Sequence, residues 1–239
     1  MIQINSEETS SLKPTADKRV SVSKISPWLM AIAYPVMRFF VLPFYLGRIE
    51  VIGQENMPKE GPVILAPTHR SRWDAFMVPY VSGRHITGRD LRFMVTSDEV
   101  TGIQGWFIRR LGGFAVNIKH PAISSLRHGV ELLLNRQMMV IFPEGGIFQD
   151  NQLHSLKPGL ARIAIQAETS GAGLGVQIVP ISIRYGNPHP TWFCGVKICI
   201  GSPIKVADYC QTHSKQNAQK LTEDLQNALK ELDEVNPTN

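Results

Sequence analysis

The chain has 239 residues, enough for one good-sized domain, and 43% of them are hydrophobic while 19% are charged. This balance is typical of a folded globular protein and excludes a chain that is disordered throughout. The formal net charge of +5 favours an anionic partner, such as a membrane face, a nucleic acid or a phosphorylated substrate.

Residues 1–24 are polar and lack the apolar centre of a secretory signal, so we expect them to form a mobile polar tail. Residues 25–48 contain the most apolar stretch, which is almost long enough to span a membrane. Because Pro35, Arg38 and Pro43 interrupt this stretch, we expect one or two short helices instead of a span.

The composition of residues 25–48 also predicts where this segment lies. Its aromatic side chains are typical of a helix at the bilayer interface, and Arg38 and the neighbouring basic residues would face anionic lipid. The alternative is a buried helix that packs on the core of the domain. We therefore expect a segment that docks on a membrane surface, with core packing as the competing interpretation.

Residues 49–239 alternate between short apolar runs, typical of strands, and longer stretches with helical periodicity. The predicted strands lie at 49–58, 61–67, 91–96, 114–118, 137–141, 176–183 and 192–204. The predicted helices lie at 72–83, 102–113, 123–136, 156–171 and 214–235. This alternation predicts one α/β domain over 49–239, with a mostly parallel sheet flanked by helices.

Three cysteines, Cys194, Cys199 and Cys210, lie late in the chain and show no C-x-x-C spacing. Their number and spacing indicate neither a disulfide framework nor a zinc site. We interpret them as reduced thiols in a cytosolic setting, with Cys194 and Cys199 filling space in a strand region.

Polar side chains follow two of the predicted strands, at THRSRWD and at PEGG, and open α/β sheets place their sites at such strand ends. In the first group His69 and Asp74 are five positions apart, which does not place them on one face of a helix. The pattern Ser71-x-x-Asp74 matches a capping box. With Ser71 as the N-cap, His69 would lie in the preceding loop and could fold back towards Asp74.

A histidine oriented by a carboxylate can take a proton from a substrate hydroxyl. The spacing alone leaves an alternative, in which Asp74 caps a helix and His69 is an ordinary loop residue. Because no serine or cysteine is marked as an enzyme nucleophile, the nucleophile of a catalytic pair would belong to the substrate.

Residues 60–181 resemble the glycerolipid acyltransferase family, and within it the 1-acylglycerol-3-phosphate O-acyltransferases. The resemblance covers about half of the chain and consists of four ordered blocks. The blocks are His69 to Asp74 (H-x-x-x-x-D), Gly105 to Asn117, Phe142 to Gly145 (F-P-E-G) and Val179 to Ile181 (V-P-I).

The resemblance implies a role for each matched residue. His69 would be the general base that deprotonates the acceptor hydroxyl for direct attack on an acyl thioester, and Asp74 would orient it. Glu144 and Gly145 would bind the acceptor, with the Glu144 carboxylate accepting from an acceptor hydroxyl or holding a nearby arginine. Lys157 resembles a basic position that reaches a phosphate, although a solvated surface lysine is an equal alternative.

Two blocks depart from the family pattern. A threonine and an arginine usually follow F-P-E-G, whereas Gly146, Ile147 and Phe148 follow it here, and Ile118 stands where the second block usually ends in arginine. Two basic contacts to an acceptor phosphate are therefore missing. The residues that could replace them are Arg72, Arg109, Arg110, Lys119 and Lys157. Otherwise the acceptor has a larger or less charged head group. Thr68, in place of the commoner asparagine before the histidine, removes an amide.

The resemblance thus implies a monotopic or peripheral acyltransferase on the cytoplasmic face of a membrane. It would move a fatty acyl group from acyl-CoA or acyl carrier protein to the sn-2 hydroxyl of 1-acylglycerol-3-phosphate, without a metal, a bound cofactor or a nucleic-acid partner. Two alternatives stay open, namely transfer to another lysophospholipid and a non-catalytic lipid-binding protein of the same fold.

Overall fold

The computed structural model describes residues 24–116, 123–150, 152–171, 173–210 and 214–234. The predicted polar tail lies outside these residues except for Lys24, and so do Asn117, Ile118 and Lys119 of the second block.

Within the described residues the strands form one sheet with the order β1-β7-β6-β2-β5-β3-β4, and β8 pairs with β6. The pairs β1–β7, β6–β2, β2–β5, β5–β3 and β3–β4 are parallel, whereas β6 is antiparallel to β7 and β8. The prediction of a mostly parallel sheet flanked by helices is confirmed. The strands are β1 (Ile49–Ile52), β2 (Val63–Pro67), β3 (Leu91–Thr96), β4 (Gly113–Val116), β5 (Met138–Val140), β6 (Gln177–Tyr185), β7 (Val196–Ile200) and β8 (Ile204–Lys205).

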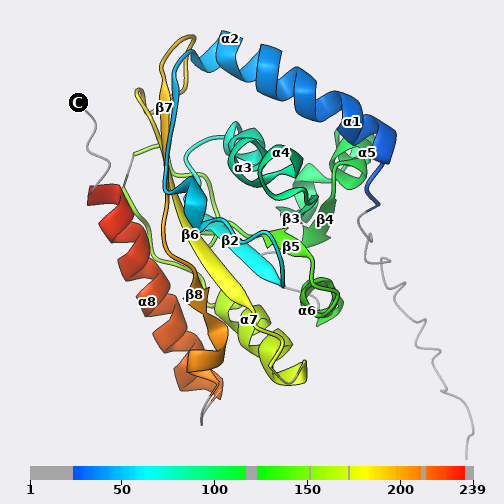
Figure 1. Cartoon of the computed structure of the whole chain (residues 1–239), viewed down its shortest axis with the longest axis vertical. Coiled ribbons are helices and arrows are strands. Elements are labelled where there is room, and N and C mark those ends of the chain that lie inside the picture. The colour runs from blue at the N-terminus through cyan, green and yellow to red at the C-terminus, as the bar shows by residue number, and fades with distance from the viewer. Residues whose placement is uncertain (1–23, 117–122, 151, 172, 211–213, 235–239) are drawn as a thin grey trace, which may run out of the picture.

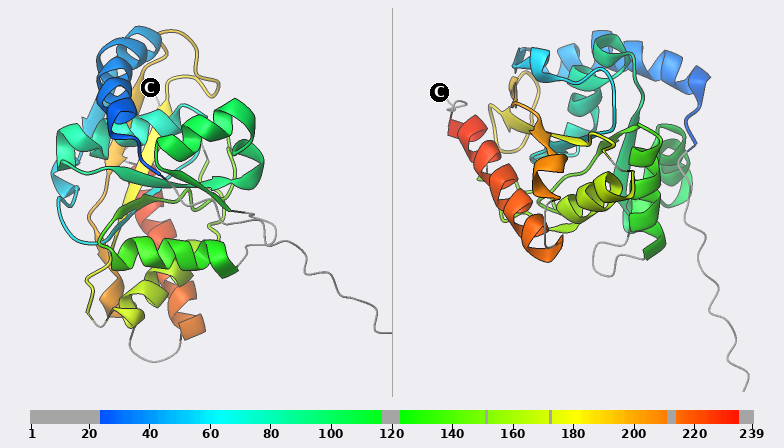
Figure 2. Two further views of the ribbon diagram at one scale, coloured as in Figure 1. Left: turned by 90° about the vertical axis from the view of Figure 1, so that its right-hand side faces the viewer. Right: turned by 60° about the horizontal axis from the view of Figure 1, so that its bottom comes forward.

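Helices cover both faces of the sheet (Figure 1, Figure 2). One face packs on α6 (Ile123–Leu134), α7 (Gly159–Ser170) and α8 (Ser214–Glu234). The other face packs on α3 (Asp74–Ser82) and on the end of the N-terminal helical segment. The short α4 (Arg84–Thr87) and α5 (Gly102–Arg110) complete the described helices, apart from single helical turns.

Strand β2 contributes side chains to two hydrophobic cores, one on each face of the sheet. All five of its residues are buried, and its neighbours on the two sides are β5 and β6. Successive side chains of a strand point to opposite faces, so Ile64 and Ala66 join the α6–α8 core while Val63 and Leu65 join the α3 core. The run GPVILAP lacks polar alternation because neither face of this strand meets water.

The N-terminal segment forms one continuous helical stretch of 20 residues, Pro27–Leu46, along one side of the domain (Figure 1). It consists of α1 (Pro27–Val36), a π-helical turn (Met37–Val41) and α2 (Leu42–Leu46). The expectation that the prolines break it is wrong. The Leu42 N–H donates to the Met37 carbonyl in the wider π turn between Pro35 and Pro43, and this turn accommodates both rings.

One side of this helical segment is bound to the rest of the domain. Arg38, the basic residue within the segment, makes one of these contacts. Arg38 donates from Nη1 to the Tyr80 carbonyl at 2.7 Å, and its guanidinium lies 4.3 Å from the Tyr80 ring centroid. Leu42 and Leu46 are buried in the α3 core. The expectation that Arg38 faces lipid is therefore wrong, because Arg38 points to α3. By length and composition Pro27–Leu46 could cross a membrane, and in the described part of the chain no second helix could.

Candidate active site

The two polar motifs emerge at the same edge of the sheet. Strands β2 and β5 are parallel neighbours, with Val63 opposite Met138, so their carboxyl ends lie side by side. The loop THRSRWD follows β2 and the loop FPEGG follows β5. The fold thus brings together the two groups that the sequence places about seventy residues apart.

His69 and Asp74 form a hydrogen-bonded pair. The distance from His69 Nδ1 to Asp74 Oδ2 is 3.0 Å, and the Asp74 side chain is fully buried. A carboxylate accepts hydrogen bonds only, so Nδ1 carries the proton and donates it. The Nε2 atom then has a free lone pair. The imidazole also stacks on the Phe142 ring, with centroids 3.9 Å apart, which restricts the ring to one plane.

Three further donors hold the Asp74 carboxylate. Oδ2 accepts from the backbone N–H groups of Arg70 at 2.6 Å and Ser71 at 2.8 Å. Oδ1 accepts from the Tyr185 hydroxyl at 2.7 Å. Burial, with the negative charge of Asp74, raises the pKa of Tyr185 far above its usual range, so this hydroxyl stays protonated and donates. Tyr185 was not singled out in the sequence.

The raised pKa of Tyr185 has a consequence for stability at alkaline pH. Above the ordinary tyrosine pKa of 10.0 the unfolded chain loses this proton while the folded chain keeps it. The contribution of Tyr185 to the free energy of unfolding is therefore fully present below pH 10. Above pH 10 it falls by about 1.4 kcal/mol per pH unit. We expect a Tyr185→Phe variant to lose stability less steeply than the parent between about pH 10 and 11. Denaturant unfolding at several pH values measures both slopes, and equal slopes would contradict the assignment.

The predicted capping box forms only in part. Helix α3 begins at Asp74, and the Ser71 hydroxyl accepts from the Trp73 N–H at 3.3 Å. The Asp74 N–H donates to the Ser71 carbonyl at 3.1 Å, so the group that the hydroxyl would cap already has a partner. The expectation that Ser71 is the N-cap is wrong. The return bond from the Ser71 N–H to Asp74 is present, and it places His69 in the preceding loop, as expected.

Thr68 sets the point at which this loop leaves the sheet. Its N–H donates to the Ile181 carbonyl at 2.9 Å, and its hydroxyl accepts from the Ile183 N–H at 2.9 Å. These bonds extend the pairing of β2 with β6 beyond Pro67. The hydroxyl of Thr68 thus binds the β6 backbone, and the V-P-I block on β6 supports the position of His69.

Glu144 ties the two loops together. Its Oε1 accepts from the His69 N–H at 3.0 Å, and both of its oxygens accept from Arg70 Nη1 at 2.9 Å. Its Oε2 also accepts from the His154 N–H at 3.1 Å. Both Arg70 and Glu144 are buried. The Glu144 carboxylate therefore holds a nearby arginine, the second of its two expected roles, and its binding of an acceptor stays a prediction.

Phe148 is one of the residues after F-P-E-G that differ from the family pattern. It contacts the loop that carries His69. The Phe148 N–H donates to the His69 carbonyl at 2.8 Å, and the Phe148 ring stacks on His154 with centroids 3.8 Å apart. Gly145 has a φ of +74°, and a Cβ there would lie 3.2 Å from Lys157 Cγ. Glycine at this position lets Lys157 pack against the loop.

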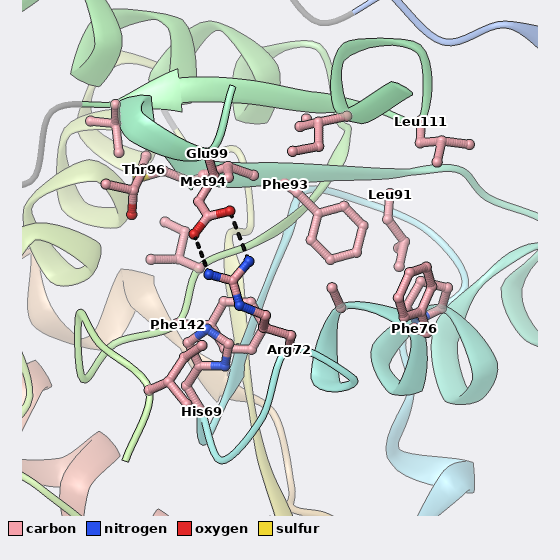
Figure 3. A pocket seen from close by; sticks show the side chains of 18 of the residues that line it. His69, Arg72, Phe76, Leu91, Phe93, Met94, Thr96, Glu99, Leu111 and Phe142 are labelled. Atoms are coloured by element: carbon pink, nitrogen blue, oxygen red, sulfur yellow. Dashed lines mark hydrogen bonds and ion pairs between the residues drawn. The ribbon is translucent and has the colours of Figure 1, made fainter. Parts of the chain in front are cut away.

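His69 borders a cavity of about 1160 Å³ with a mainly apolar lining (Figure 3). Its walls come from the N-terminal helix, α3, β3, α5 and the start of α7. Figure 3 shows His69 against Phe142, with apolar side chains of α3 and β3 around the space. The apolar lining residues include Met30, Met37, Phe76, Leu91, Phe93, Met94, Phe107, Ile108, Leu111 and Phe142. A space of this size and lining suits a hydrocarbon chain.

The predicted substrate-binding arginines lie in different surroundings. Arg72 lines the cavity, but its guanidinium makes a two-pronged ion pair with Glu99, at 2.9 and 3.0 Å (Figure 3). Arg109 donates to the Val100 carbonyl at 3.3 Å, and the Arg110 guanidinium lies 5.3 Å from the Trp106 ring centroid. A role for these arginines in substrate binding stays a prediction.

Two cations, one just before α7 and one in its first turn, line the same cavity as His69. They are the predicted Lys157 and the unpredicted Arg162. Neither side chain has an ion-pair partner among the described residues. Arg162 carries no signal in the sequence, because only the packing of α7 against the F-P-E-G loop brings it to the cavity. A negatively charged group in the cavity would find two free cations there.

Within the described ranges no group of three or more His, Cys, Asp or Glu side chains is arranged to hold a metal ion. The expectation that the reaction needs neither a metal nor a bound cofactor stays a prediction.

Comparison with known proteins agrees with this geometry. The family described as acyltransferase matches residues 48–184, more than half of the chain. The 1-acyl-sn-glycerol-3-phosphate acyltransferase of Bacillus subtilis (strain 168) is 25% identical over 190 residues, which cover 78% of this chain and 89% of that protein. Glycerol-3-phosphate acyltransferase 1, mitochondrial, of Homo sapiens is 24% identical over 157 residues, which cover 62% of this chain but 19% of that protein.

A solved structure shares the fold. The crystal structure of the 1-acyl-sn-glycerophosphate (LPA) acyltransferase PlsC from Thermotoga maritima matches with a TM-score of 0.59. The match covers 79% of this chain and 72% of that chain at 23% sequence identity.

Proposed function

This chain belongs to the acyltransferase family, and on that premise we propose that it moves a fatty acyl group from a thioester to the sn-2 hydroxyl of 1-acylglycerol-3-phosphate. The donor would be acyl-CoA or acyl carrier protein. The observation that carries the proposal is the His69 imidazole, which borders a large apolar cavity while its Nδ1 is held by the buried Asp74. The relatives named for 1-acyl-sn-glycerol-3-phosphate support the choice of acceptor.

The proposed reaction needs one base and no enzyme nucleophile. The acceptor hydroxyl gives its proton to His69 Nε2 as its oxygen bonds to the thioester carbonyl carbon. The tetrahedral intermediate then collapses, the carbon–sulfur bond breaks, and the imidazolium returns the proton to the leaving thiolate. The Asp74 carboxylate stabilises the imidazolium between the two steps, and its three other donors keep it in place.

We propose that Lys157 and Arg162 bind the acceptor phosphate. Both line the cavity that His69 borders, and the loop between them and His69 lacks the arginine usual after F-P-E-G. The positive charge would thus reach the phosphate from the start of α7 and the residue just before it, instead of from the positions directly after F-P-E-G. Arginine suits this task because its planar guanidinium can donate two parallel hydrogen bonds to phosphate oxygens.

An Arg162→Gln variant tests this assignment. We expect kcat/KM to fall about tenfold or more with 1-acylglycerol-3-phosphate, because a charge-assisted hydrogen bond to the phosphate is lost. With lysophosphatidylcholine, which lacks a free phosphate monoester, the same substitution should change kcat/KM by less than about twofold.

The matched control is Arg127→Gln, which removes an exposed arginine of α6 outside the cavity lining. It should leave kcat/KM unchanged with both acceptors. An equal loss with both acceptors in Arg162→Gln would contradict a role in phosphate recognition.

We also propose that Pro27–Leu46 docks the enzyme as a peripheral or monotopic protein on the cytoplasmic face of a membrane. This helix exposes a row of large apolar residues, here called the docking face, namely Trp28, Ile32, Val36, Phe39, Phe40 and Phe44. The other side of the helix is held by the Arg38 contact and by the buried Leu42 and Leu46. An apolar outer side with a fastened inner side fits a helix in the interface plane.

The experiment that tests the function uses the purified chain, one labelled acyl thioester and a panel of acceptors. The panel contains 1-acylglycerol-3-phosphate, lysophosphatidylcholine, lysophosphatidylethanolamine and glycerol 3-phosphate. Phosphatidic acid labelled at sn-2 is the expected product. Preferred transfer to another acceptor would replace the proposed substrate, and lipid binding without transfer to any acceptor would favour a non-catalytic lipid-binding protein.

A further inference from the structure

The loop between β6 and β7 exposes two large adjacent aromatic side chains. Trp192 is 59% exposed and Phe193 is 67% exposed. Phe193 also has a φ of +58°, a left-handed conformation that bulky residues seldom adopt. This backbone conformation and the exposure of both rings are unfavourable for a loop that meets only water.

The loop is attached firmly to the end of α2. The Phe193 N–H donates to the Tyr45 carbonyl at 2.7 Å, and the Gly195 N–H donates to the Leu46 carbonyl at 2.9 Å. The Tyr45 hydroxyl donates to the Pro190 carbonyl at 2.9 Å. These three bonds hold the aromatic pair in place, so its exposure is a property of the fold.

The loop continues the docking face. The ring centroid of Trp192 lies 5.4 Å from that of Phe44, and the ring centroid of Phe193 lies 6.5 Å from it. Figure 1 shows the β6–β7 loop beside α2, at the far end of the helix from α1. The exposed apolar row of the helix therefore extends sideways onto a second segment of the chain.

We propose that Trp192 and Phe193 enter the bilayer interface as a second membrane anchor. This inference rests on the membrane docking in the proposed function and adds a second segment of the chain to it. The N-terminal end of the helix is also held on the domain, because the Ser26 N–H donates to the Arg110 carbonyl at 3.0 Å and Met30 is buried. With both ends held, Pro27–Leu46 lies parallel to the membrane. Crossing the bilayer would carry the attached loop, with its backbone polar groups, into hydrocarbon.

The chemistry of the surface favours lipid as the partner. Tryptophan and phenylalanine beside an exposed basic side chain are typical of segments at the membrane–water interface. Arg48 supplies that side chain, because it is 86% exposed and its carbonyl accepts from the Val196 N–H at 2.9 Å. Its contact with Glu50, at 3.6 Å, lies between two exposed side chains, and such a surface ion pair is weak. The Arg48 guanidinium can meet anionic head groups while the two rings enter the acyl boundary.

Vesicle sedimentation tests the proposal with the full-length protein. The vesicles contain equal parts of phosphatidylcholine and phosphatidylglycerol, and the variant is Trp192→Ser/Phe193→Ser. We expect its partition coefficient to fall by about tenfold or more, because two aromatic rings no longer leave water. A Leu134→Ser control, at an exposed apolar residue of α6, should bind vesicles as the parent does. Unchanged binding of the double variant would overturn the proposal.

A second measurement uses a milder change and does not depend on the folding of the double variant. Brominated phospholipid in the vesicles should quench part of the tryptophan fluorescence of the parent, and a Trp192→Phe variant should lose a distinct part of that quenching. Equal quenched intensity in the two proteins would overturn the proposal.

The outcomes separate this inference from the proposed function. Acyl transfer from a soluble short-chain thioester to a monomeric acceptor should be the same, within about twofold, in parent and double variant, because the anchor lies outside the catalytic cavity. Vesicle binding without any acyl transfer would contradict the function and keep the anchor. Acyl transfer with no vesicle binding by the parent would overturn the anchor and keep the function.

Discussion

A His69→Ala variant is expected to lose about 10²- to 10⁴-fold in kcat while it unfolds at nearly the same denaturant concentration as the parent. In the proposed mechanism activity is lost because no other group would take the proton of the acceptor hydroxyl in place of His69 Nε2. Stability is kept because Asp74 retains three donors, from Arg70, Ser71 and Tyr185, so that no buried charge is left unpaired. Initial rates with a labelled thioester and denaturant unfolding measure the two quantities.

His154→Ala is the matched control for this variant. His154 also pairs with an aspartate, because its Nε2 lies 2.8 Å from Asp150 Oδ2, but the pair lies on an exposed part of the loop. The backbone bond from His154 to Glu144 survives the substitution. We expect the rate to stay within about threefold of the parent, since His69, the proposed base, is intact. A His69→Ala variant that is as active as His154→Ala would exclude His69 as the base.

A Glu144→Ala variant is expected to lose about 3–5 kcal/mol of unfolding free energy and most of its activity. The loss is large because Arg70 would keep a buried, unpaired positive charge, and because the N–H groups of His69 and His154 would lose their acceptor. The His69 loop would then no longer be tied to the loop after β5. Denaturant unfolding and initial rates give the two losses.

The paired substitution Arg70→Met/Glu144→Leu distinguishes the effect of this ion pair on stability from its effect on the reaction rate. It removes both buried charges, so part of the lost stability should return while the rate stays low. If Glu144→Ala instead keeps its stability and raises KM for the acceptor, Glu144 binds the acceptor directly, which is the first of the two roles that the family resemblance implies.

The predictions for His69 and Glu144 concern two kinds of contact. The first kind can be recognised in the sequence, and the second cannot. The pair His69–Asp74 is near in sequence and part of a recognisable block, so its chemistry was expected from the residues and the resemblance. Arg70 and Glu144 lie 74 positions apart, and Tyr185 lies 111 positions from Asp74. No local pattern marks a charged residue as the buried partner of another on a different strand.

The sequence by itself determined the α/β class, the positions of most strands and helices and the place of the two polar loops at strand ends. It could do so because side-chain burial repeats every second residue in strands and every third or fourth in helices, which is local information. It misjudged Ser71, because the Ser71 carbonyl takes the Asp74 N–H in a tight turn. It also misjudged the proline-containing helix, because a π turn accommodates the rings.

Only the tertiary structure decided which distant groups meet. The order β6-β2-β5 brings Tyr185 to Asp74 and Glu144 to Arg70, and the packing of α7 brings Arg162 to the cavity beside His69. The same holds for Arg38, which contacts α3, and for Trp192, whose loop is tied to the end of α2. Such contacts depend on strand order and helix packing, which arise from the burial of the whole core. They produce no periodic pattern of residues in the sequence.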